Sequence, residues 1–217
     1  MPDATSSDPL SFRRITRIDR TAFDRILEIY LDVFPASERK RPDVLWERLG
    51  EDGVFAFELT SGRQTVGMAI AHRLEGVDAV LLEYMGVRRD SWDQGLGQTL
   101  FRRITAAPDL SHLTFLLEVE SVGGQDPGGE RARRKAFYAG LGCREVEGMA
   151  YLMPRVGAAP PPPMNLLIYA DPPLQHVRKQ VIGRWLQAIY HQVYRRTDAD
   201  ADIALMLKDL PDAPRLI

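Results

Sequence analysis

Apolar side chains recur along the chain with a period that changes from one stretch to the next. Residues 11–19 alternate between apolar and polar positions, which predicts a strand. Apolar residues from 21 to 34 recur at helical spacing behind Thr21, a candidate N-cap, and a second short helix is predicted from Pro42 to Gly50. The chain is therefore expected to open with a strand and two helices.

Three longer apolar runs follow, and turn residues separate them. They read GVFAFELT (53–60), QTVGMAIAHRLEG (64–76) and DAVLLEYMGV (78–87), and they are joined at SGR and EGVD. Runs of this length connected by short polar turns predict an antiparallel meander.

Strands and helices alternate after the meander. A helix is predicted over 93–104, a strand over 113–121 and a helix over 129–142. Because a strand, helix, strand order joins strands that run in the same direction, we expect one parallel pair. Two further strands are predicted over 144–156 and 164–170, on either side of a proline run that acts as a stiff connector.

The fold class expected from this order is α/β, with a mixed central sheet flanked by helices and an extra C-terminal helix. That last helix, over 174–197, has apolar residues at Val177, Val181, Trp185, Ile189 and Val193. It needs a partner surface, either on its own domain or on a second subunit, and we favour a homodimer. The expected organisation is a flexible tail at 1–10, one α/β domain at 11–170 and a helical extension at 171–217.

Composition narrows the class of partner. The 217 residues are 45% hydrophobic and 27% charged, with a net charge of −2, which is typical of a soluble protein. Basic residues are scattered among acids, so we expect no nucleic-acid partner, and no apolar run reaches the roughly 20 residues that cross a bilayer. With one cysteine and no secretory segment near Met1, the expected setting is the cytoplasm and the expected partner a small molecule.

The stretch EYMGVRRDSWDQGLGQTLFRRI, residues 83–104, carries the first candidate chemistry. A strand, a turn with two glycines and a helix follow one another there, an order that gathers free N–H groups and the positive end of a helix dipole around phosphates. The expected ligands are the main-chain amides of Gln94, Gly95, Leu96, Gly97 and Gln98. Arg88 and Arg89 supply nearby cations. The alternative is that both glycines only let the helix pack closely on the sheet.

Two motifs together resemble the GNAT superfamily of N-acetyltransferases, which use acetyl-CoA. The family's pyrophosphate motif runs Gln or Arg, two variable residues, Gly, one variable residue, then Gly or Ala. Residues 92–97 match it at both glycines and depart from it at Trp92. The segment AFYAGLGC, residues 136–143, resembles the family's FYxxLGF segment, and MGV ends the expected strand before the turn. The resemblance covers residues 11–170.

This resemblance implies a direct transfer of the acetyl group from acetyl-CoA to a primary amine of a small molecule or, as second choice, of a protein. It implies that main-chain groups of Met85 and Val87 hold the pantetheine arm and polarise the carbonyl. Tyr138 matches the tyrosine that protonates the departing thiolate, and a phenol is protonated at neutral pH. The alternative for Tyr138 is a core aromatic residue, and Phe137 beside it is expected to face the core.

A carboxylate must accept the proton of the incoming amine. Glu83 is the first choice and Glu118 the second, and Glu118 shares one strand face with Glu120. Either carboxylate could instead bind a cationic substrate or remain solvated. Glu38 and Arg39 follow the first helix, where the resembling fold binds its acceptor, although a solvated loop explains them equally well.

Other residue types suggest no further chemistry. The histidines His72, His112, His176 and His191 show no metal-ligand spacing, and Cys143 is expected to be buried, so we expect no metal and no covalent cysteine. Arg131, Arg134 and the long loop VGGQDPGG depart from the family on the acceptor side. Two alternatives remain: an acyl-CoA sensor of the same fold, favoured by Trp92, and an interaction protein that uses the C-terminal helix.

Overall fold

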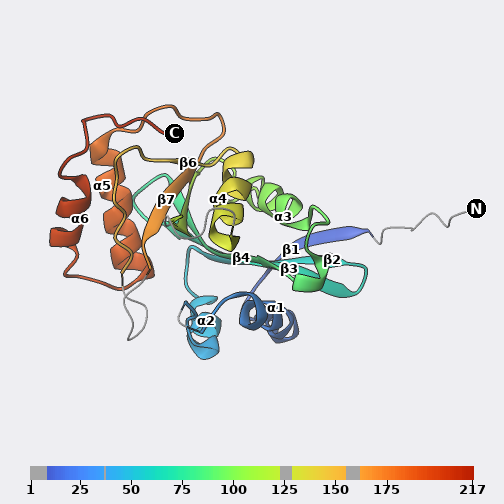
Figure 1. Ribbon diagram of the computed structural model, residues 1–217. Helices are drawn as coiled ribbons and strands as arrows, with labels where there is room; N and C mark the ends of the chain where they lie inside the picture. Colours follow the sequence, from blue (N-terminus) through green and yellow to red (C-terminus); the bar gives the residue numbers. More distant parts are fainter. Residues whose placement is uncertain (1–8, 37, 123–128, 155–161) are drawn as a thin grey trace, which may run out of the picture. The chain divides into compact units, whose positions relative to one another are not determined.

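A computed structural model describes residues 9–36, 38–122, 129–154 and 162–217 (Figure 1). The chain forms two compact units: Met1–Ala71 with Tyr84–Ala107, and His72–Glu83 with Pro108–Ile217. Most of the expected tail, most of the loop VGGQDPGG and half of the proline run lie outside the described residues, and the boundary predicted at residue 170 stays a prediction.

Within the described residues, seven strands form one mixed sheet in the order β1-β2-β3-β4-β5-β7-β6. Strands β4 and β5 are parallel, as expected, whereas β1 with β2, β5 with β7 and β6 with β7 are antiparallel. The predicted α/β class is therefore confirmed. The strands are β1 (Leu10–Ile15), β2 (Val54–Ser61), β3 (Gln64–Leu74), β4 (Ala79–Val87), β5 (Thr114–Glu120), β6 (Arg144–Glu145) and β7 (Met164–Tyr169).

The first unit contains α1 (Arg20–Val33), α2 (Pro42–Arg48) and α3 (Leu96–Thr105). Helix α1 is capped by Asp19, whose carboxylate accepts the N–H of Ala22 at 3.0 Å, and not by Thr21 as the sequence suggested. A carboxylate caps a helix as well as a hydroxyl does, and here it stands two residues earlier. The core of this unit joins the apolar face of α1 to β2, β3 and β4.

The second unit contains α4 (Glu130–Gly140), α5 (Lys179–Ala188), a π-helical turn η2 (Ile189–Val193) and α6 (Asp200–Leu207). Helices α5 and α6 lie side by side (Figure 1). Trp185, Ile189 and Val193 belong to a core shared with β5 and β7. The apolar face of the C-terminal helix is thus covered by its own unit, and the homodimer remains a prediction.

Three expected boundaries are wrong. The helix predicted from residue 93 begins at Leu96. Of the strand predicted over 144–156, the described residues 144–154 contain β6 and isolated bridges at Val146 and Tyr151, and residues 155 and 156 lie outside the described part of the chain. The single helix predicted over 174–197 is α5 followed by η2. None of the helices in the described part of the chain is long and apolar enough to span a membrane.

Candidate active site

The glycine turn of the first unit connects β4 to α3 through a short 3-10 segment, η1 (Arg89–Ser91). Asp93 has φ of 61° and Gly95 has φ of 74°, so two residues near the helix start adopt the left-handed conformation. That conformation costs a non-glycine residue roughly 1–2 kcal/mol, which makes Asp93 a strained position. Because of these left-handed residues the chain turns before it becomes helical, so α3 begins at Leu96 with Gly95 as its N-cap.

The amides expected to bind phosphate therefore lie at the start of a helix. The first N–H groups of a helix have no partner within the helix, and the dipole there favours an anion. Gln94 and Gln98 are exposed, whereas the Leu96 side chain lies in the core and leaves only its main chain for a ligand. A Cβ at Gly95 would meet no atom within 4 Å, so its left-handed backbone, not crowding, is what requires glycine there.

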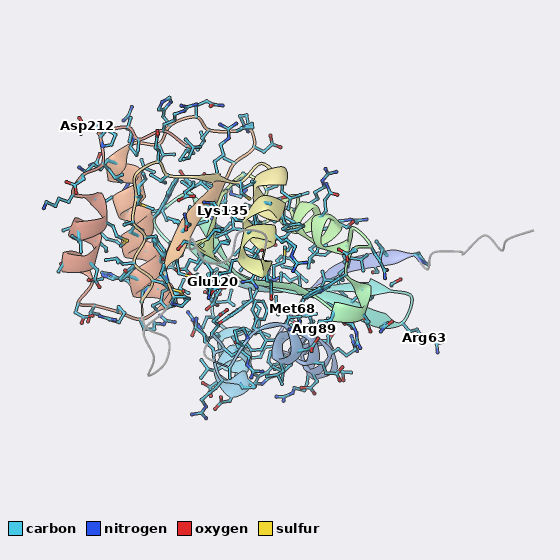
Figure 2. The ribbon with its side chains drawn as sticks, viewed as in Figure 1. Arg63, Met68, Arg89, Glu120, Lys135 and Asp212 are labelled. Carbon is cyan, nitrogen blue, oxygen red and sulfur yellow. The ribbon has the colours of Figure 1, made fainter. Side chains whose placement is uncertain are left out.

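Trp92 stands where the resembling motif has Gln or Arg, and it is built into the turn. Its indole N–H donates to the carbonyl of Val87 at 2.9 Å, and the Arg89 guanidinium lies 5.2 Å from its ring centroid. Arg89, labelled in Figure 2, also lies 3.5 Å from the carboxylate of Asp32. Arg88 lies 3.5 Å from Asp90. Both expected cations are thus beside the turn, each next to an acid.

Met85 and Val87 are half-buried on the last part of β4, in this same unit. Glu38 and Arg39 lie in the loop after α1, and each makes a hydrogen bond within the first unit. The Arg39 guanidinium donates to the carbonyl of Leu31 at 2.9 Å, and the main-chain carbonyl of Glu38 accepts the phenol of Tyr84 at 3.0 Å.

In the second unit, Glu83 pairs with a histidine that sequence reasoning left without a role. Nε2 of His72 lies 2.6 Å from Oε2 of Glu83, and the two side chains are only 6% and 4% exposed. His72 is on β3 and Glu83 on the next strand of the hairpin. Their positions on two consecutive strands of a predicted hairpin are the sequence signal from which this contact could have been predicted.

Glu118 on β5 is held by two phenols that the sequence analysis also missed. Tyr151 donates to Oε1, and Tyr194 donates to Oε2 at 2.5 Å. Burial, with the charge of Glu118 adding to it, raises the pKa of Tyr151 and Tyr194 well above the usual value. The charge of Glu83 also raises the pKa of Tyr194, which places both candidate bases in one cluster.

Glu120 takes different partners from Glu118, although the two share a strand face. Its carboxylate lies 3.1 Å from Arg131 and 3.7 Å from Arg134, both on α4. Figure 2 labels Glu120 on β5 and Lys135 on α4, and Lys135 pairs with Glu145 at 2.6 Å. The two arginines that depart from the family pattern are therefore paired with an acid.

Tyr138 is the buried aromatic residue of α4, at 9% exposure, and Phe137 beside it is only half-buried. Phe137, which was expected to face the core, packs its ring against Tyr138, with centroids 5.1 Å apart. Burial raises the pKa of Tyr138, the Cys143 thiol adds to this, and Arg134 lowers it, so the phenol remains a proton donor far into the alkaline range. Cys143 is buried as expected, and burial raises the pKa of its thiol to about 12.

The structure thus gathers the predicted residues into separate groups within each unit. The first unit holds the turn with Arg88 and Arg89, and the second holds Glu83 with Glu118, and Tyr138 on α4. In the described ranges no three His, Cys, Asp or Glu side chains are arranged to hold a metal ion, and the expected absence of a metal stays an expectation.

Comparison with known proteins gives matches among solved structures. No family model and no curated protein matches the amino-acid sequence. A protein assigned to the GNAT acetyltransferases, from Bacteroides thetaiotaomicron, is similar with a TM-score of 0.68 and 18% identity, over 86% of this chain and 99% of that one.

Two further neighbours have named activities or ligands. The ribosomal-protein-S18-alanine N-acetyltransferase of Escherichia coli has a TM-score of 0.52 and 19% identity, over 74% of this chain and 91% of its own. Arabidopsis thaliana NAA60 in complex with acetyl-CoA has a TM-score of 0.55 and 13% identity, over 74% and 98%. Sequence identities this low support a shared fold and nothing more. On these matches, the chain has the fold of the GNAT acetyltransferases.

Proposed function

We propose that this protein transfers an acetyl group from acetyl-CoA directly to a primary amine of a small molecule. The observation that carries the proposal is the strained glycine turn that starts α3 in a chain with the GNAT fold. A neighbour of this fold binds acetyl-CoA, and the turn here offers backbone amides, a helix dipole and two arginines to a pyrophosphate. A cytoplasmic setting and a homodimer remain predictions.

The groups of the turn fit the phosphate end of the co-substrate. In the proposed arrangement the amides of residues 94–98 donate hydrogen bonds to the pyrophosphate oxygens. Arg88 and Arg89 exchange part of their pairing with Asp90 and Asp32 for phosphate oxygens. Main-chain groups of Met85 and Val87 bind the pantetheine arm and polarise the thioester carbonyl.

The proposed mechanism assigns the proton transfers to Glu83 and Tyr138. Glu83 takes one proton from the incoming ammonium, which frees the nitrogen lone pair to form a bond with the carbonyl carbon. As the carbon–sulfur bond breaks, the phenol of Tyr138 gives its proton to the thiolate. The phenolate then recovers a proton from the nitrogen of the new amide, and Glu83 returns its proton to solvent. One proton is released for each amide and thiol formed.

Burial around the proposed base favours a small acceptor. The side chains of Glu83 and His72 are almost fully buried, and phenols occupy both oxygens of Glu118. A small amine has fewer atoms to accommodate beside such buried groups than an amine on a folded protein has. A protein amine is therefore the second choice.

Thermal-shift measurement with millimolar acetyl-CoA, followed by release of free thiol with a panel of amines, tests the function. Stabilisation together with amine-dependent thiol release supports the enzyme. Stabilisation without turnover across the panel would favour the sensor, for which Trp92 in place of Gln or Arg is the supporting observation. Failure of acetyl-CoA to stabilise the protein would overturn both.

A further inference from the structure

We propose that Tyr151 and Tyr194 are positioning residues that hold Glu118 as an ionised carboxylate, the group that receives the ammonium of the acceptor. Glu83, paired with His72, is then the group that takes its proton. This inference rests on the proposed acetyltransferase function. It assigns substrate binding and proton transfer to two different carboxylates, which the sequence left as alternatives for one role.

The hydrogen bonds on Glu118 leave it suited to binding charge. Each of its two oxygens accepts one phenol hydrogen, and both bonds are stronger to the ionised carboxylate than to the protonated acid. Hydrogen bonds to the charged form favour that form. A carboxylate can accept about four hydrogen bonds, and an ammonium group has three N–H donors to offer it.

The partners of the two carboxylates differ in what they can do with a proton. Tyr151 and Tyr194 are held as donors, because burial and the charge of Glu118 disfavour their ionised forms. The imidazole of His72 can both give and accept a proton, and it bonds Glu83 directly. The Glu83–His72 pair is therefore the member of this cluster equipped to take a proton and pass it on.

The backbone of the C-terminal segment has two unusual features beside Tyr194. The N–H of Tyr194 bonds the carbonyl of Ile189 at 3.2 Å, the wide spacing of a π-helical turn, and such turns often accompany functional sites. Arg195 immediately after it has φ of 56°, a strained conformation for a residue with a side chain. A helix that only covered apolar surface would need neither feature.

Two further contacts fix this segment on its own unit. The side-chain amide of Gln192 bonds both the N–H and the carbonyl of Glu75, at 2.8 and 3.0 Å. The buried phenol of Tyr190 donates to the carbonyl of Leu152, one residue after Tyr151. The segment therefore holds the neighbourhood of both phenols that bind Glu118.

This arrangement specifies the chemical class of the acceptor. Two carboxylates favour an amine that approaches as a cation and disfavour one with its own carboxylate beside the amine. We expect amines to be acetylated in preference to the matching amino acids. Cadaverine compared with lysine, and tyramine compared with tyrosine, are pairs that differ only by that carboxylate.

The kinetic test compares Tyr151→Phe and Tyr194→Phe with a matched control, Tyr169→Phe, which removes a phenol from the β7 position that pairs with Phe115 and not with Glu118. With the best amine of the panel, both test variants should lose about tenfold to a hundredfold in kcat/KM for the amine, with the KM of acetyl-CoA unchanged. The acidic limb of the pH profile should move to higher pH in both and stay in place in the control. An unmoved limb, or an equal shift in the control, would overturn the assignment.

A second readout does not depend on turnover. In protein labelled with isotopic glutamate, the carboxyl signal of Glu118, assigned with Glu118→Gln, is followed by NMR as the pH falls. Its titration should move to higher pH in Tyr151→Phe and Tyr194→Phe and not in Tyr169→Phe. Glu83, His72 and Tyr190 are present in all three variants, so a shift confined to the two test variants comes from the lost phenols. This shift without amine turnover would refute the proposed function alone, and turnover without this shift would refute the positioning role alone.

Discussion

Tyr194 donates its phenol hydrogen to Oε2 of Glu118 at 2.5 Å across 76 positions of sequence. The bond joins the end of a C-terminal π-helical turn to the middle of strand β5. It makes the terminal segment part of the immediate surroundings of a candidate substrate-binding carboxylate. Changes in that segment are therefore expected to alter proton equilibria at the site as well as stability.

The first prediction concerns the ionisation of these phenols. Burial is the largest cause of the raised pKa of Tyr151 and Tyr194, and the charge of Glu118 adds to it. Glu118→Gln should therefore lower both pKa values, although burial keeps them above the ordinary value of 10. Ultraviolet absorbance of tyrosinate during an alkaline titration measures this. Glu120→Gln, which removes a carboxylate paired with arginines, should leave the titration of both tyrosines unchanged.

The second prediction concerns the proposed acid, Tyr138. Tyr138→Phe keeps the ring and its packing but removes the donor, so kcat should fall by about 10²- to 10⁴-fold with little change in the KM of acetyl-CoA. Because its pKa is raised, the protonated donor persists beyond pH 10, and kcat should show no alkaline fall from this group below that pH. Steady-state kinetics with chemistry as the slow step measures both. A loss confined to thermal stability would identify a core aromatic residue instead.

A third prediction places the pyrophosphate. Gly97→Val puts a branched side chain at the start of α3, so affinity for acetyl-CoA should fall by at least about tenfold while the fold persists. Gly140→Val is the matched control, because it also replaces a helical glycine and its Cβ would meet nothing within 4 Å. Calorimetric titration compares the two. Wild-type affinity in Gly97→Val would show that the phosphates lie elsewhere.

The fourth prediction concerns acid stability of the first unit. Glu58 is fully buried and bonds Arg25 at 2.8 Å, Thr65 at 2.6 Å and Arg13 at 2.7 Å. Burial alone would raise the pKa of Glu58, but these partners lower it below the ordinary value of 4.5. The stability gained from ionised Glu58 is therefore complete above pH 4.5 and is lost as the pH falls through the lowered value.

Glu58→Gln should accordingly cost about 1–3 kcal/mol at neutral pH and flatten the acid branch of the stability curve. Denaturant unfolding over a range of pH measures the effect. Asp43→Asn provides the comparison, because the Arg41–Asp43 pair is exposed and such pairs contribute about 0–1 kcal/mol. Equal losses in the two variants would mean that burial adds nothing to the Glu58 cluster.

Sequence reasoning located the elements that local patterns control. Alternation and helical spacing gave the order of strands and helices, and the order alone predicted the parallel pair β4 and β5. Adjacent helix residues point about 100° apart, and helical spacing alone did not say that Tyr138 would be more buried than Phe137. The start of α3 moved because left-handed residues near Gly95 follow from turn geometry, which periodicity does not contain.

The side-chain contacts of the two candidate carboxylates in the second unit could not be predicted from periodicity or element order. His72 with Glu83, and Glu118 with its two phenols, join residues 11, 33 and 76 positions apart, and no repeat along the chain links them. Tyr151 and Tyr194 looked like ordinary aromatic residues in a strand and a helix. Only the fold shows that their hydroxyl groups meet one carboxylate.

The paired bonds between Gln192 and Glu75 connect a late helical turn to the β3–β4 hairpin across 117 positions. The amide hydrogen of Glu75 lies in a tight turn, and it is its bond to the Gln192 side chain that shields it from exchange with solvent. A single amide in the hairpin therefore reports whether the C-terminal segment has docked. Its exchange rate, followed during refolding, would time the moment at which Tyr194 arrives beside Glu118 and the acceptor side of the site becomes complete.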